Sequence, residues 1–164
     1  MRTHWKELLD VFSALGYLVK ELDPNGVDLY FTNHSGYCSF RHRSKVTEIL
    51  ETMTQEGDTD IELRLQIILQ PYMEKLEKRA KGQPSFQWNP RAKEVIRPMN
   101  IYVLTDGCWE DACTGDKQIR NFANKLDELN FTKNQVGIQF ISFGRDQAGL
   151  DRLNCLDSDI ETAL

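Results

Sequence analysis

Apolar side chains recur at steps of three and four residues in several stretches of the chain, and this spacing places them on one face of a helix. Residues 61–79 carry the clearest such stripe, with Pro71 inside it, where a proline costs about 3 kcal/mol or kinks the helix. Ser44 is a suitable N-cap for a further helix that carries Val46, Ile49, Leu50 and Met53. The pattern also predicts helices over residues 2–22, 115–129 and 148–156.

Between these helices lie shorter stretches with the patterns of β-strands. Residues 27–33 alternate apolar and polar positions, and residues 37–40 fit a short edge strand after a turn. Residues 99–104 are almost continuously apolar, which predicts a strand covered on both faces, and residues 136–143 form another strand. Strands that alternate with helices predict an α/β protein with a doubly wound, mostly parallel sheet.

Composition and charge fit one globular domain over residues 1–164. The net charge of -5 gives no basic surface for nucleic acid, so no nucleic-acid partner is expected. No apolar run approaches the roughly 20 residues of a membrane span, and no signal peptide is recognisable, so we expect a soluble cytoplasmic protein. The four cysteines form no Cys-x-x-Cys pair, which predicts free thiols rather than a zinc site.

Ligands of doubly wound sheets bind beyond the carboxyl ends of the strands, so the loops from Asn33, Asp58 and Asp106 are candidates. The sequence contains no dinucleotide-binding glycine motif, P-loop or nucleophile elbow. Asp106 follows a strand and Thr59 precedes a helix, and their oxygens are ligand types that suit Mg²⁺ or Mn²⁺. The structural alternative is that Asp106 and Gly107 form an ordinary turn, while Thr59 or Asp58 caps the helix.

Four segments, in order, resemble a von Willebrand factor type A (VWFA) domain of the kind abundant in filamentous fungi. They are Val-Asp-Leu-Tyr-Phe at 27–31, Gly-Asp-Thr at 57–59, Ile-Tyr-Val-Leu-Thr-Asp-Gly at 101–107 and Val-Gly-Ile-Gln-Phe-Ile-Ser-Phe-Gly at 136–144. The similarity runs from about residue 1 to residue 160. It implies a three-layer α/β/α, Rossmann-like fold and a metal-ion-dependent adhesion site built from three loops. By position, Thr59 matches the second loop and Asp106 the third.

The chain departs from this family at the first loop, because no Asp-x-Ser-x-Ser motif occurs in the sequence. By the resemblance, the chain begins just after that motif and lacks the first, central strand of the sheet. We therefore expect the strands at 27–33 and 99–104 each to lack a neighbour. We also expect Mg²⁺ or Mn²⁺ to bind weakly or not at all, because Mg²⁺ demands a near-ideal octahedral ligand set.

The resemblance implies a non-enzymatic protein-interaction module, in which a carboxylate of the partner protein binds to the metal. Thr59 and Asp106 are the expected, incomplete set of metal ligands. The expected partner contacts are Asp58, Asp60, Trp109 and Glu110. For these acidic residues the alternative is a solvated loop charge, and for Trp109 it is packing against residues 108–114.

Two other functions remain open on the residues alone. One is an Mg²⁺-dependent phosphotransfer enzyme with Asp106 as the nucleophile. Enzymes of that kind typically need a second aspartate two residues away, and position 104 is Leu. The other is a degenerate remnant that binds no ligand.

Overall fold

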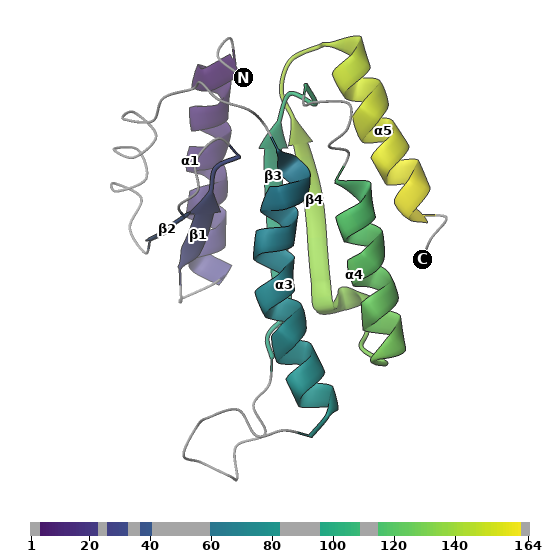
Figure 1. Cartoon of the computed structure of the whole chain (residues 1–164). Helices are drawn as coiled ribbons and strands as arrows, with labels where there is room; N and C mark the ends of the chain where they lie inside the picture. Colours follow the sequence, from purple (N-terminus) through teal and green to yellow (C-terminus); the bar gives the residue numbers. More distant parts are fainter. Residues whose placement is uncertain are drawn as a thin grey trace.

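The computed structural model of the chain describes residues 4–22, 26–32, 37–40, 60–82, 96–108 and 115–161. Over these residues the protein is a mixed α/β structure (Figure 1). Its elements, in chain order, are α1 (Trp5–Leu22), β1 (Val27–Tyr30), β2 (Tyr37–Phe40), α3 (Ile61–Ala80), β3 (Met99–Thr105), α4 (Asp116–Glu128), the 3₁₀ turn η2 (Lys133–Gln135), β4 (Val136–Ser142) and α5 (Gln147–Glu161). The helix expected after Ser44 lies outside the described residues.

The strands form two separate two-stranded sheets in the described part of the chain. Strands β3 and β4 are parallel, with Met99 opposite Val136 and Thr105 opposite Ser142. Strands β1 and β2 are antiparallel, with Val27 opposite Phe40. The prediction of an α/β protein with a parallel strand pair is confirmed. Within the described residues, β1 pairs only with β2 and β3 only with β4.

The main core lies between the helices α3 and α4 and one face of the β3–β4 sheet. The stripe predicted on residues 61–79 is confirmed, since Leu65, Leu69 and Leu76 are buried. They pack with Phe122 of α4, and the half-buried side chains of β3 and β4 contact this cluster. α3 continues through Pro71, which lies on the exposed side of the helix. The core contacts of α3 therefore offset the destabilising effect of Pro71 on the helix.

Strand β3 differs from its prediction, because its two faces are not equally covered. Ile101 and Val103 are half-buried against the core beneath α3 and α4. Tyr102, on the other face, is 39% exposed. The continuous apolar run therefore predicted a strand correctly. The prediction that both faces of this strand are covered is wrong.

The side chain of Tyr72 attaches the second half of α3 to the amino ends of both parallel strands. Its hydroxyl donates a hydrogen bond of 2.6 Å to the carbonyl of Arg97, just before β3. The same hydroxyl accepts a hydrogen bond of 2.5 Å from Nε2 of Gln135, the residue before β4. Gln135 is 9% exposed, so this polar contact is largely shielded from water. Burial raises the pKa of the Tyr72 hydroxyl.

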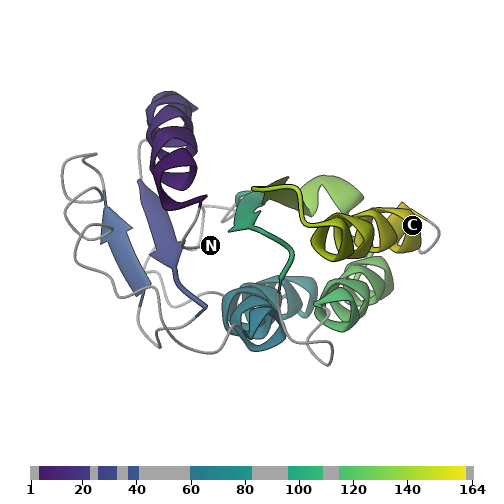
Figure 2. The same cartoon turned by 90° about the horizontal axis from the view of Figure 1, so that it is seen from above.

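The amino-terminal elements form a smaller unit of α1, β1 and β2. Apolar residues of α1 and of the segment around β1 share one cluster, namely Trp5, Leu9, Phe12, Val27, Leu29 and Phe31. The rings of Tyr30 and Tyr37 stack across the β1–β2 pair at 5.2 Å. Viewed from above, this unit lies to one side of α3, α4 and α5 (Figure 2). β1 ends at Tyr30 instead of Asn33, and α5 extends beyond the predicted residue 156 to Glu161.

Candidate functional site

The parallel strands bring several chain segments together at their carboxyl ends. β3 and β4 end at the same edge, and Asp106 follows β3 directly. The first turns of α1 and α3 lie at this end of the molecule (Figure 1). His4 comes close to the chain that follows β4, because a Cβ on Gly144 would lie 2.6 Å from its Nε2 atom. The structure therefore places Asp106 where a doubly wound sheet offers a ligand site.

The turn at Asp106 is held by local hydrogen bonds between neighbouring residues. The buried hydroxyl of Thr105 accepts a hydrogen bond of 3.0 Å from the backbone N–H of Gly107. Oδ1 of Asp106 accepts a hydrogen bond of 3.2 Å from the backbone N–H of Cys108. This is the local bonding by which aspartate stabilises a turn. One oxygen of the Asp106 carboxylate therefore stabilises an ordinary turn, which is the alternative to a metal ligand that the sequence offered for Asp106 and Gly107.

Two glycines allow the start of α5 to pack against this turn. Gly107 has a φ of 73°, and a Cβ added there would lie 2.6 Å from the backbone of Gly149. A Cβ on Gly149 would in turn meet the carbonyl oxygen of Asp106. Arg152, one turn further along α5, donates a hydrogen bond of 3.1 Å from Nη1 to the carbonyl of Gly107. The position of Asp106 is therefore fixed by a helix more than 40 residues later in the chain.

Asp60, one of the expected partner contacts, is the N-cap of α3. Its Oδ1 atom accepts a hydrogen bond of 2.8 Å from the backbone N–H of Leu63. The sequence placed the cap at Thr59 or Asp58, and that prediction is wrong by one or two residues because the helix begins at Ile61. A carboxylate at this place stabilises the helix through both the hydrogen bond and the helix dipole.

Four of the expected site residues lie outside the described residues, namely Asp58, Thr59, Trp109 and Glu110. The structure brings Asp60 and Asp106 to the same end of the molecule. Each of these carboxylates gives one oxygen to a backbone N–H group. Among the described side chains, no group of three or more His, Cys, Asp or Glu residues is arranged to hold a metal ion.

Arg64, in the first turn of α3, is a residue of this region that the sequence patterns did not identify. Its side chain is only 8% exposed. Its charge acts on Tyr30 at the end of β1, where it opposes the rise in the pKa of the Tyr30 hydroxyl that burial causes. The only signal in the sequence is an arginine between Leu63 and Leu65 in an apolar stripe.

Cys108 places an exposed thiol next to Asp106. Partial desolvation, with the carboxylates of Asp106 and Asp146, raises the pKa of this thiol. A thiol that stays protonated is a poor nucleophile, so the group has no sign of catalytic activation. Cys38, Cys108 and Cys155 are free, as predicted, and Cys113 lies outside the described residues.

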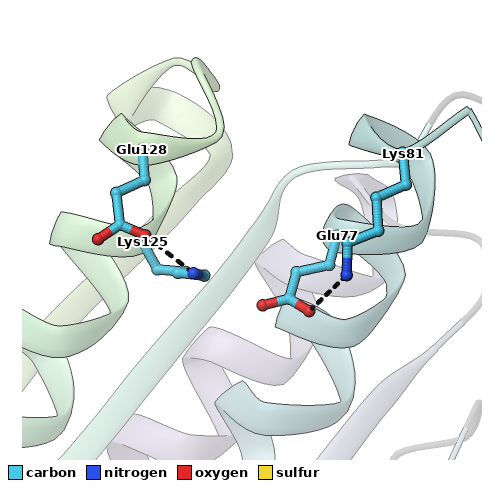
Figure 3. A network of polar contacts seen from close by, with 4 residues as sticks. All are labelled: Glu77, Lys81, Lys125 and Glu128. Carbon is cyan, nitrogen blue, oxygen red and sulfur yellow. Dashed lines mark hydrogen bonds and ion pairs between the residues drawn. The ribbon is translucent and has the colours of Figure 1, made fainter.

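A second polar region lies far from Asp106, on a groove of about 460 Å³ between α3 and α4. Leu69, Met73 and Phe122 contribute apolar surface to this groove. At one end Glu77 pairs with Lys81 at 3.9 Å, and Lys125 pairs with Glu128 at 2.8 Å (Figure 3). Glu128 raises the pKa of Lys125. These pairs are exposed, so they contribute little to stability.

Comparisons with known proteins returned no match: no family model, no curated protein and no solved structure is similar to this chain. The resemblance to VWFA domains therefore depends on the sequence motifs alone. No helix in the described segments is both long and apolar enough to cross a membrane.

Proposed function

We propose that the chain is a protein-interaction module of the VWFA type, with a three-layer, Rossmann-like architecture in which the described residues supply no central strand between β1 and β3. The parallel pairing of β3 and β4, with α4 as the connection between them, supports this proposal. So does the division into two sheets, because β1 pairs only with β2, and β3 only with β4, among the described strands.

The observation that carries the proposal is the position of Asp106. Its half-buried carboxylate follows the last residue of β3, beside the carboxyl end of β4 and at the end where α1 and α3 begin. Loops at this edge of an α/β sheet are the usual place for binding groups, because the strands hold them rigidly.

The described residues do not fit a tightly held Mg²⁺ or Mn²⁺. Asp60 and Asp106 each direct one carboxylate oxygen to a backbone N–H, and the guanidinium of Arg152 bonds to the turn at Gly107. Mg²⁺ requires an octahedral set of oxygens, which these two aspartates do not provide. We therefore propose that the protein groups at this edge contribute directly to partner binding.

Site-specific photo-crosslinking in cells tests this proposal. A photoreactive amino acid replaces Cys108, which is exposed and adjacent to Asp106, and in a control protein it replaces Asp127, which is exposed on α4. We expect a discrete adduct only from position 108, and we expect Asp106→Ala to abolish it. Equal adducts from both positions, or none from position 108, contradict the proposal.

Isothermal titration distinguishes an interaction module from a complete metal site, and a phosphatase assay distinguishes it from an enzyme. We expect no micromolar Kd for Mg²⁺ or Mn²⁺, in the wild-type chain or in Asp106→Asn. A micromolar Kd that Asp106→Asn removes contradicts the incomplete site. A phosphatase activity of the purified chain that the same substitution abolishes contradicts the non-enzymatic function.

A further inference from the structure

One long edge of β3 carries backbone groups without a strand partner in the described structure. The carbonyl of Thr105 accepts a hydrogen bond of 2.8 Å from the N–H of Phe143, so the backbone of Thr105 is directed toward β4. The N–H and C=O groups of one strand residue point to the same side, and the side alternates along the strand. The backbone groups of Asn100, Tyr102 and Leu104 are therefore directed away from β4.

The side chains of β3 do not protect this edge. The seven residues Met99–Thr105 include no lysine, arginine, aspartate, glutamate or proline. Natural edge strands usually carry such residues, which prevent another strand from pairing with them. Apolar surface is exposed as well, because Tyr102 is 39% exposed and Leu104 is half-buried. Chemically, β3 has the character of an inner strand of a sheet.

The neighbours of β3 limit what can pair with this edge. In both views, the α1–β1 unit lies beside β3 on the side away from β4 (Figures 1 and 2). β1 pairs with β2 and with no other described strand. A single extended segment is the simplest element that pairs with such an edge. Such a segment forms hydrogen bonds through its backbone, so its recognition does not require charged side chains.

We propose that this edge of β3 binds an extended, uncharged, apolar strand of another polypeptide. The proposal rests on the interaction function proposed above, but it uses the long edge of β3 and not Asp106. Both faces of β3 carry apolar side chains, Ile101 and Val103 on one and Tyr102 and Leu104 on the other. Apolar side chains on both faces of the added strand therefore make the favourable cross-strand pairs. This is recognition by strand addition.

Amide hydrogen exchange with a synthetic peptide tests this proposal. The probe is a blocked peptide of alternating valine and isoleucine with lysines at both ends, and the control is the same peptide with proline at alternate positions. When the probe occupies about nine tenths of the protein, exchange at Tyr102 and Leu104 slows about tenfold. The proline peptide leaves both rates unchanged, because it lacks the N–H groups that a strand ladder needs.

Two substitutions locate the effect. Tyr102→Pro removes an N–H that does not face β4, so β3 and β4 stay paired while the probe no longer binds. Should that chain fail to fold, Tyr102→Lys places a charge on the same edge strand, with Gln139→Lys at the opposite register position on β4 as its control. We expect Tyr102→Lys to weaken binding and Gln139→Lys to retain it. Asp106→Asn should also retain binding of the probe. A failure of this proposal can therefore be distinguished from a failure of the proposed site at Asp106.

Four results overturn the proposal. They are unchanged exchange at Tyr102 and Leu104 with the probe, slow exchange of both amides in the free chain, and protection that accompanies dimerisation of the chain. The fourth is protection of these amides only when the probe sequence is fused to the chain ahead of α1. That result would mean that the edge pairs with a covalently joined segment and not with another polypeptide.

Discussion

The two parts of the molecule differ in how their strands are supported. β3 and β4 form a parallel pair of seven residues each, and α3 and α4 cover one face of it with a cluster of buried side chains. β1 and β2 form an antiparallel pair of four residues each, against which α1 packs. Side-chain burial is described for residues 5–14, 27–30 and 37–39 of these elements, and among them Leu8 is the one buried hydrophobic side chain.

This difference shows which strand pair is covered by the helices adjacent to it in the chain. A parallel pair joined by a helical crossover brings its own cover, since the helix packs back onto the strands. A short two-stranded hairpin is marginally stable alone and depends on what packs around it. The stability of the chain should therefore depend mainly on α3, α4, β3 and β4, while β1 contributes less.

The largest expected effect comes from Leu76→Ala, because Leu76 is 0% exposed in the core of the larger part. We expect this substitution to lower the free energy of unfolding by about 2–5 kcal/mol. Leu29→Ala, at a half-buried position of β1, should cost about 1 kcal/mol. Urea unfolding followed by circular dichroism measures both. An equal or larger loss from Leu29→Ala contradicts the difference between the two parts.

Gly107→Ala tests the contact that positions Asp106. A residue at a φ of 73° costs about 1–2 kcal/mol, and the clash with Gly149 adds about 1–3 kcal/mol. Gly82→Ala is the matched control, because its φ is 67° and nothing lies within 4 Å of the added Cβ. Thermal unfolding of both variants separates the two costs. If Gly82→Ala is as destabilising as Gly107→Ala, the packing of α5 against the turn is unimportant.

Tyr72→Phe removes the hydroxyl that joins α3 to the starts of β3 and β4. We expect a loss of about 1–3 kcal/mol, because the amide of Gln135 loses a shielded hydrogen-bond partner. Tyr102→Phe removes the same group from an exposed position and should change stability by no more than about 0.5 kcal/mol. Equal effects of the two substitutions in urea unfolding contradict this assignment.

The same hydroxyl predicts a pH dependence. Burial raises the pKa of Tyr72 in the folded chain above its ordinary value of 10.0. The folded state then holds this proton more tightly than the unfolded state, so stability falls as the pH rises above 10. The fall should be smaller in Tyr72→Phe, and unfolding curves recorded between neutral pH and pH 11 measure the difference. An identical decline in both proteins shows that Tyr72 does not contribute.

Asp60→Ala should have a small effect, about 1 kcal/mol, because it removes the N-cap of α3. Asp127→Ala is the control, since Asp127 is exposed near the other end of a helix, where a negative charge is unfavourable. Urea unfolding should show a loss only for Asp60→Ala. A neutral Asp60→Ala substitution contradicts the capping role that the geometry assigns.

Local periodicity predicted the elements of the larger part almost to their ends. The stripe at 61–79 became α3, and the apolar run at 99–104 became β3 with one more residue. These patterns are visible because each segment faces one continuous core. The end of β1, the end of α5 and the cap at Asp60 were placed less well, because element ends depend on hydrogen bonds that spacing does not reveal.

The candidate site was predictable only in part. A strand followed by Asp106 indicated the carboxyl edge of the sheet, and the structure places the residue there. The contact of Gly107 with Gly149 and the buried position of Arg64 were not predictable, because each depends on segments distant in the chain. The two-sided cover expected for β3 was wrong because periodicity reports the character of a strand and not the presence of its neighbours.

Native-state amide exchange along β3 in the free chain tests the central claim most directly, namely that this strand is paired on one side only. We predict alternation: slow exchange at Ile101 and Val103, whose N–H groups are directed toward β4, and fast exchange at Tyr102 and Leu104. Uniformly slow exchange at all four amides would mean that the edge is already occupied and would contradict the account.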